Sequence, residues 1–259
     1  MNRIVAITCA ALGLVGLLAV AGLVWPVLSG YPGRIVDETP VPFDRSRLHA
    51  DLAAQGLRLG NEAFVRIFKR EHRLEVFVRQ DGGRFVLFRG YDICTYSGGL
   101  GPKLEEGDRQ APEGFYRVAH AQLNPNSRHH LAFNIGFPNA FDRSLDRTGS
   151  FLMVHGGCSS IGCYAMTDAQ IDEIYAITEA ALAGGQQQVD VAIFPFRMTE
   201  TALSAEAGSQ WAPFWRNLKQ GFDLFEVEGV PPEVAACNGL YVFGTAARAD
   251  GCMPISGWV

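Results

Sequence analysis

Alternation of apolar and polar side chains predicts a series of β-strands in the first part of the chain. Between Arg73 and Arg79 every second residue is aliphatic, which is the period of a strand with two different faces. Asp81-Gly82-Gly83 follows and tolerates positive φ, so this strand and the next one form a predicted hairpin. The predicted strands are Ala63–Lys69, Arg73–Arg79, Arg84–Tyr91, Gly114–Ala119, Leu131–Phe137 and Phe151–Val154, the last running directly into His155.

The apolar spacing changes to that of a helix after Thr167. Thr167-Asp-Ala-Gln170 has the pattern of a capping box, in which the Thr and Gln side chains satisfy free amides at the helix start. Apolar residues follow at helical spacing until Gly184-Gly185, where the helix is expected to end. We predict a further strand over Val189–Ile193 and a second helix within Thr199–Gln220. The apolar face of that second helix consists of Trp211, Phe214, Trp215 and Leu218.

The order of these elements indicates a mostly β fold with a few helices, of the α+β class. The stretch from 31 to 60 is expected to be a linker with one short helix, Asp44–Gln55, ended by Gly56. The folded domain is expected to cover residues 61–228, and residues 229–259 form a C-terminal extension without a usable motif.

The first thirty residues predict export. No charged residue occurs from Ile4 to Leu28, and Arg3 lies on the short side before this run. Ala19-Val20-Ala21 fits the small-x-small pattern of a signal-peptide cleavage site. The run of about 25 residues is also long enough to span a bilayer, which favours a retained anchor over a cleaved leader. Both alternatives place the rest of the chain in the periplasm. A retained anchor would also tether it to the inner membrane.

Composition and charge exclude several classes of protein. Hydrophobic residues make up 48% of the 259 residues and charged residues 19%, which is not the composition of a disordered protein. The net charge of −5 argues against nucleic acid as a partner and against a polybasic membrane-surface protein.

The cysteines of an exported chain either pair or react. Cys9 lies in the N-terminal segment, so five remain, and at least one of them stays unpaired unless it bonds another chain. Cys237 could pair with Cys252 and Cys94 with Cys158, which leaves Cys163. Other pairings stay open at this point, as does the possibility that several cysteines are merely small buried hydrophobes.

The segment His155-Gly-Gly-Cys-Ser-Ser-Ile-Gly-Cys163 carries the clearest candidate chemistry. A cysteine nucleophile attacks as thiolate and needs a nearby base, and the pKa of histidine suits that task near neutral pH. Gly162 allows a tight turn whose backbone amides could face a developing oxyanion. Two alternatives compete: a zinc site of His155, Cys158 and Cys163, and a Cys158–Cys163 disulfide that would block the nucleophile.

Several motifs in this chain resemble the YkuD-type L,D-transpeptidases. His155-Gly156 followed by Ser160-x-Gly162-Cys163 is similar to the catalytic motif of that family, and residues 111–116 (Ala-Pro-Glu-Gly-Phe-Tyr) resemble its upstream T-P-x-G-x-F segment. Longer stretches resemble the YafK branch of murein L,D-transpeptidase-like proteins. They are residues 94–103 (Cys-Thr-Tyr-Ser-Gly-Gly-Leu-Gly-Pro-Lys), 134–140 (Asn-Ile-Gly-Phe-Pro-Asn-Ala), 162–166 (Gly-Cys-Tyr-Ala-Met) and 193–198 (Ile-Phe-Pro-Phe-Arg-Met).

The resemblance implies a β-sandwich with a mixed sheet and a cysteine enzyme without a cofactor or metal. Cys163 would be the nucleophile and His155 its general base and acid, while Ser160, Gly162, Gly156 and the Cys163 amide would shape the oxyanion region. The substrate would be the peptide stem of peptidoglycan. The thiolate would attack the carbonyl at the L-centre of the diamino acid at stem position three, expel D-alanine and form a thioester, which an amine of another stem or of a lipoprotein would then resolve.

Two departures from the family pattern bear on the reaction. Ile161 stands where most members have a second His, and Tyr164-Ala165-Met166 stands where most have an apolar residue, Arg and an apolar residue. The YafK branch shares these departures and is linked to hydrolysis of the amide that joins an outer-membrane lipoprotein to the diamino acid. The alternatives are therefore transfer, hydrolysis, a non-catalytic module that binds the cell wall, and a structural zinc protein.

Three further residues are candidates for substrate binding. Arg197 could bind a stem carboxylate with two hydrogen bonds, or form a structural salt bridge. Asn134 could line the groove or cap a turn, and Tyr96 could line the groove or pack in the core.

Overall fold

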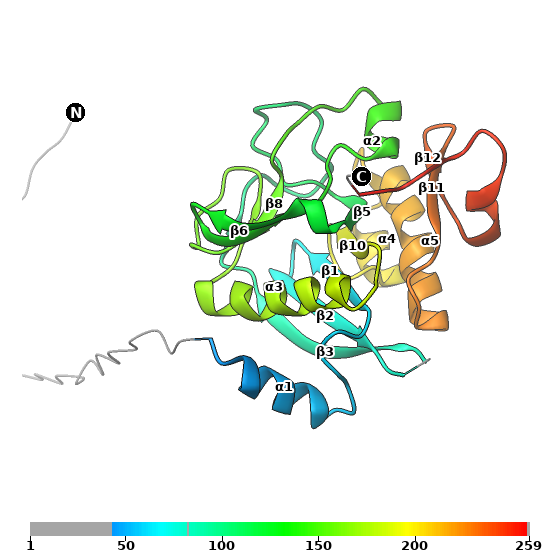
Figure 1. Cartoon of the computed structure of the whole chain (residues 1–259). Coiled ribbons are helices and arrows are strands. Elements are labelled where there is room, and N and C mark those ends of the chain that lie inside the picture. Colours follow the sequence, from blue (N-terminus) through cyan, green and yellow to red (C-terminus); the bar gives the residue numbers. More distant parts are fainter. Residues whose placement is uncertain (1–42, 82, 258–259) are drawn as a thin grey trace, which may run out of the picture. The chain divides into compact units, whose positions relative to one another are not determined.

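The structure is a computed structural model that describes residues 43–81 and 83–257, and all of them belong to one compact unit. It has the mixed α+β architecture that the sequence predicts, with two five-stranded sheets and one three-stranded sheet (Figure 1). The first sheet has the order β3-β2-β1-β10-β5 and consists of β1 Ala63–Phe68, β2 Arg73–Arg79, β3 Phe85–Asp92, β5 Gly114–Val118 and β10 Val189–Phe194. Its central strand pairs antiparallel with β2 and parallel with β10, so the sheet is mixed.

The second sheet has the order β4-β9-β8-β7-β6 and carries the predicted catalytic motif. Its strands are β4 Thr95–Tyr96, β6 Leu123–Ser127, β7 His130–Asn134, β8 Met153–His155 and β9 Tyr164–Ala165. A small third sheet consists of β11 Val234–Cys237, β12 Leu240–Phe243 and β13 Met253–Pro254. The helices are α1 Arg45–Ala53, α2 Ala140–Ser144, α3 Asp168–Ala183, α4 Glu200–Ala205 and α5 Ala212–Glu228, with short 3-10 turns η1 His120–Gln122 and η2 Gly244–Arg248.

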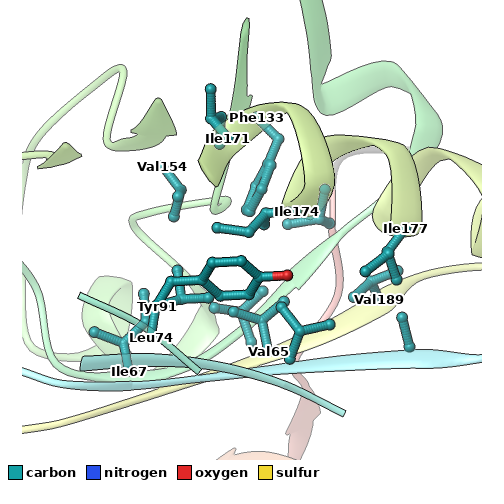
Figure 2. Close-up of a cluster of buried hydrophobic side chains, with 14 of the residues drawn as sticks. Val65, Ile67, Leu74, Tyr91, Phe133, Val154, Ile171, Ile174, Ile177 and Val189 are labelled. Atoms are coloured by element: carbon teal, nitrogen blue, oxygen red, sulfur yellow. The ribbon is translucent and has the colours of Figure 1, made fainter. Parts of the chain in front are cut away.

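The first sheet lies between two hydrophobic cores, because both of its faces are apolar. Val65 and Ile67 of β1 face a first core that they share with β7, β8 and α3, as Figure 2 shows. Phe64 and Phe68 point to the opposite face, into a second core that α5 covers. Because both faces of β1 are buried, its side chains do not alternate between apolar and polar: Arg66 is the one polar residue of the strand, and it is buried as well.

The start of α3 is fixed where the capping-box pattern predicts. The Gln170 amide donates to Thr167 Oγ1 at 3.2 Å, and the Thr167 amide donates to Gln170 Oε1 at 3.0 Å. Ile171 and Ile174 on the first turns pack in the first core beside Val154 of β8 (Figure 2). The helix start is therefore anchored beside the predicted catalytic motif.

Three predicted elements differ clearly from the structure. The second helix is in fact two helices, α4 and α5, and α5 runs past Gln220 to Glu228, where Gly229 takes the left-handed conformation. β8 begins at Met153 and not at Phe151, which is 70% exposed with φ of 54°. β7 ends at Asn134 rather than Phe137, since Gly136 has positive φ and its amide donates to the Asn134 side chain.

The packed body extends beyond the predicted domain of residues 61–228. Leu48 and Leu52 of α1 lie in the first core, and Val234, Tyr241 and Ile255 from the C-terminal strands and their surroundings lie in the second. The predicted leader or membrane anchor, residues 1–30, lies outside the described residues. Over 43–81 and 83–257, no helix combines the length and hydropathy required to cross a bilayer.

Candidate active site

The pairing of β8 with β9 brings His155 and Cys163 to one face of the second sheet. The two strands run parallel, with Val154 opposite Tyr164 and His155 opposite Ala165. Val154 and Tyr164 both lie in the first core. Because successive side chains of a strand point to opposite faces, His155 points to the other face. Cys163 directly precedes Tyr164 of β9, so the same alternation directs it to the face that carries His155.

The His155 ring is buried and held in one orientation. Its Nδ1–H donates to the carbonyl oxygen of Gly156 at 2.6 Å, and the residue is 3% exposed. Because a carbonyl can only accept, Nδ1 carries the proton and Nε2 keeps a free lone pair. Burial lowers the pKa of His155; the bond to Gly156 opposes this change, and the nearby His129 ring, with its centroid 4.7 Å away, adds to it. The ring is therefore a neutral base at neutral pH, with Nε2 as its accepting atom.

Cys163 is half-buried and is the one cysteine without a disulfide among the residues that the structure describes. Burial raises the pKa of its thiol, while a backbone hydrogen bond from Met153 and the charge of Lys103 act in the opposite direction. The thiol donates to the Phe151 carbonyl at 3.5 Å. Within the described residues Sγ makes no hydrogen bond to His155. Because burial raises the pKa of Cys163 and lowers that of His155, the resting groups at neutral pH are a thiol and a neutral imidazole. Hydrogen bonds of this kind often tighten only when a substrate binds.

Two hydroxyl groups bind the backbone amides that the sequence suggested for an oxyanion. Ser160 Oγ accepts from the Cys163 amide at 2.9 Å and donates to the Cys163 carbonyl at 2.7 Å. The Gly162 amide donates to Ser97 Oγ. Gly162 is buried with φ of +97°, a conformation that favours glycine. An oxyanion would reach either amide only by displacing a hydroxyl, and Ser97 was not predicted to take part.

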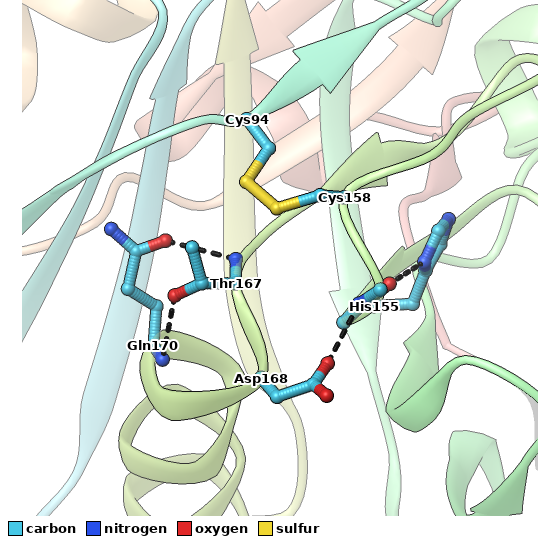
Figure 3. Close-up of a disulfide and its surroundings, with 8 residues drawn as sticks. Cys94, His155, Cys158, Thr167, Asp168 and Gln170 are labelled. Carbon is cyan, nitrogen blue, oxygen red and sulfur yellow. Dashed lines mark hydrogen bonds between the residues drawn. A yellow bond between two sulfur atoms is a disulfide. The ribbon is translucent and has the colours of Figure 1, made fainter. Parts of the chain in front are cut away.

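The disulfides have the pairing that the sequence suggested first. Cys94 is bonded to Cys158, and Cys237 to Cys252. The first bond joins the chain just before β4 to the loop after His155, close to the start of α3 (Figure 3). It overturns the alternative Cys158–Cys163 bond and takes Cys158 away from the alternative zinc site.

Lys103 and Asp168 lie beside the motif, and the sequence reasoning gave neither of them a role. Lys103 is buried, and its Nζ donates to the Glu105 carbonyl at 2.9 Å and to Asp108 Oδ1 at 2.5 Å. Asp168, the first residue of α3, accepts the amide hydrogen of Gly157 at 2.8 Å. In the sequence, Lys103 lies in one of the segments that resemble the family, and Asp168 directly follows the capping residue Thr167. Their proximity to Cys163 and to Gly157 becomes visible only in the folded chain.

The three candidates for substrate binding have different surroundings. Arg197 donates to Glu75 Oε1 at 2.6 Å and lies over the Phe68 ring, which is the structural salt bridge weighed as the alternative. Tyr96 pairs with Tyr164 and packs against the first core.

Asn134 shares the face of the second sheet that carries the motif. It lies opposite Met153, the residue two before His155, and is buried. Its Oδ1 accepts the Gly136 amide at 2.8 Å, which is the turn-capping role, while Nδ2 has no hydrogen-bond partner in the described part of the chain.

Comparison with known proteins identifies the family of the chain. The L,D-transpeptidase catalytic domain (YkuD) matches residues 62–191, half of the chain. The chain belongs to this family of peptidoglycan-acting enzymes. It is 48% identical over 184 residues to "Putative L,D-transpeptidase YafK" of Escherichia coli strain K12, which covers 71% of this chain and 74% of that protein. The family resemblance of the motifs is confirmed.

Two solved structures match the chain more distantly. The helical cell shape determining protein Pgp2 of Campylobacter jejuni is 20% identical with a TM-score of 0.43, over 70% of this chain and 66% of that one. Bd1075 of Bdellovibrio bacteriovorus is 21% identical with a TM-score of 0.37, over 63% and 60%. This chain thus matches less than two thirds of either protein, and the family assignment rests on the sequence matches.

Proposed function

We propose that this protein is a cysteine-dependent acyl-enzyme catalyst that acts on the peptide stems of peptidoglycan. The observation that carries the proposal is the hydrogen bond from His155 Nδ1 to Gly156. It leaves Nε2 as a proton acceptor on the same sheet face as Cys163, the described cysteine without a disulfide. Family membership supplies the class of substrate.

The proposed reaction starts from the neutral pair. As Sγ attacks the carbonyl at the L-centre of the stem diamino acid, its proton passes to His155 Nε2, and a tetrahedral oxyanion forms. The imidazolium then gives this proton to the departing amine of D-alanine, the carbon–nitrogen bond breaks, and a thioester remains on Cys163. The Lys103 charge, which lowers the pKa of the thiol, favours the sulfur as negative charge develops on it.

The thioester on Cys163 can react with an amine, which is transfer, or with water, which is hydrolysis. In the second candidate reaction the amine that leaves in the first step belongs to a lipoprotein rather than to D-alanine, and water then hydrolyses the thioester on Cys163 to a free diaminopimelate carboxylate. The two departures from the family pattern favour this hydrolysis. Ile161 is 80% exposed where most members have a His, and Ala165 is fully buried where most have an Arg that could bind the carboxylate of a second stem. With neither polar group to hold an acceptor stem, water is the simpler acceptor.

The proposed location is outside the cytoplasm, in the periplasm. The two disulfides support an oxidising compartment. Whether the N-terminal segment is removed or retained as an inner-membrane anchor stays a prediction, and so does a lipoprotein partner.

The test is digestion of purified muropeptides, with and without attached lipoprotein remnant, followed by mass spectrometry. Wild-type protein should release D-alanine or the remnant, or form a new 3–3 crosslink, and Cys163→Ala should do none of these. Asp81→Asn, which opens the exposed ion pair with Arg58, is the control with an intact motif. Full activity in Cys163→Ala would refute the mechanism, and binding without any product from wild type would favour the non-catalytic module.

A further inference from the structure

One peptide group connects His155 to a carboxylate on α3. The Gly156 carbonyl accepts the His155 Nδ1 hydrogen at 2.6 Å, and the Gly157 amide donates to Asp168 Oδ1 at 2.8 Å (Figure 3). This carbonyl and this amide are the two ends of the same planar peptide bond. The imidazole and the carboxylate are therefore joined through one rigid, conjugated group.

A carboxylate at one end of a peptide group changes the hydrogen bond at the other end. When Asp168 accepts the N–H hydrogen, electron density shifts through the C–N bond towards the carbonyl oxygen, because successive hydrogen bonds polarise each other. The oxygen then becomes a stronger acceptor for Nδ1–H. The gain is largest when the ring is protonated, since hydrogen bonds from charged donors are the stronger ones.

We propose that Asp168 is a positioning residue for His155, acting through the Gly156–Gly157 peptide to orient the ring and to stabilise the imidazolium that forms when Cys163 gives up its proton. The inference rests on the proposed function for the roles of His155 and Cys163. It adds to them a carboxylate that does not touch the ring.

The surroundings show that this arrangement is closely packed. A Cβ at position 156 would lie 2.6 Å from Asp168 Oδ1 and 3.0 Å from both the His129 carbonyl and Ile171 Cγ2, so only glycine lets the peptide approach the carboxylate. Asp168 is held at the first position of α3 by the Thr167–Gln170 capping box. Ile171, one turn later, is fully buried in the first core and prevents the helix from shifting.

Several charged or titratable groups surround the pair and must be kept constant in a test. His129 contributes its ring from the turn between β6 and β7. Lys103 acts on Cys163 from the loop before β5. One turn further along α3, Asp172 Oδ1 lies 2.7 Å from His130 Nε2.

An alternative is that Asp168 only stabilises the start of α3, because a carboxylate in the first turn favours any helix. Asp172 offers a matched control, because it lies on the same helix, also bonds a neighbouring group and does not contact the Gly156–Gly157 peptide. Asp168→Asn keeps the shape and one accepting oxygen but removes the charge.

The experiment measures the rate at which iodoacetamide alkylates Cys163 in the full chain between pH 5 and pH 9.5, resolved by peptide mass spectrometry. This readout needs no substrate. Asp168→Asn should slow alkylation about 3- to 10-fold near pH 6–7 and leave the rate at pH 9.5 unchanged, because a thiolate forms there without help from an imidazolium. Asp172→Asn should keep the wild-type profile.

The base itself supplies the second part of the test. His155→Ala should remove the same pH-dependent component, and adding Asp168→Asn to it should have no further effect. A wild-type profile for Asp168→Asn, or an equal loss at every pH, would overturn the inference. If the profile changes as expected while muropeptides stay intact, the proposed function fails and the inference about Asp168 stands.

Discussion

Replacing Glu113 by Gln is expected to lower the free energy of unfolding by about 3–5 kcal/mol, the usual cost of breaking a buried ion pair. The side chains of Glu113 and Lys69 are both fully buried, with Nζ 3.1 Å from Oε1. Oε1 also accepts the Gly101 amide at 2.7 Å, and Oε2 accepts the Trp215 indole N–H at 2.8 Å. A Gln side chain has only one accepting oxygen, so its NH₂ group would face either the Trp215 indole N–H or the Lys69 ammonium, and both of these are donors. In either orientation the negative charge opposite Lys69 is lost, and Lys69 keeps only the neutral carbonyls of Gly101 and Ala111 as certain acceptors.

The magnitude follows from the geometry. At an effective dielectric constant of about 20, two charges 3.1 Å apart interact by about 5 kcal/mol. The relief available to the variant is loss of the Lys69 proton, since burial already lowers the pKa of Lys69. A lysine with a folded-state pKa below its unfolded value makes the protein more stable as pH rises through the interval between the two. The penalty in Glu113→Gln should therefore shrink between pH 7 and pH 10.

Urea unfolding followed by circular dichroism measures this effect. Asp81→Asn is the control, because its ion pair with Arg58 is exposed, with 69% and 68% of the two side chains accessible. That change should stay within about 0.5 kcal/mol. A loss below about 1 kcal/mol for Glu113→Gln, or a penalty that grows with pH, would refute the reasoning.

Three further predictions use the same structure. Gly156→Ala should lower kcat on muropeptides at least about 10-fold, because a Cβ there meets a carboxylate oxygen at 2.6 Å, and wild-type turnover would contradict it. Lys103→Met should raise the pH midpoint of Cys163 alkylation by about 0.5–1 unit, because the lysine charge lowers the pKa of that thiol; a midpoint that stays or falls would count against this. Replacing Cys237 and Cys252 together by Ser opens a loop with a sequence separation of 15 and should cost about 3 kcal/mol in urea unfolding, and an unchanged midpoint would exclude this.

Local patterns predicted the elements whose cause is local. The alternation in β2, the capping box of α3 and the glycines after it all correspond to observed boundaries. The end of the last helix depends on distant residues instead. Gly221 is a poor helix residue, so the sequence pattern favours an earlier end. In the folded chain the rings of Phe115 and Phe243 pack directly against Gly221, in the space that a side chain would need, and the helix continues through this contact.

The same distinction applies to the candidate site. Counting the cysteines indicated that at least one stays unpaired but left the pairing open, and the family motif named His155. Ser97 and Asp168 could not be assigned in this way, because their partners Gly162 and Gly157 come from other loops and meet them only in the folded chain. The charge of Arg197 was visible in the sequence, whereas its engagement by Glu75 was not.

The central claim is that Cys163 carries the acyl group during the reaction. The direct measurement is the mass of the full-length protein after rapid mixing with a stem peptide and acid quenching, with the modified residue located by peptide mapping. The account predicts an added mass equal to the acyl fragment on Cys163 in wild type and none in Cys163→Ala. Product formation by Cys163→Ala, or an acyl group found on another residue, would contradict it.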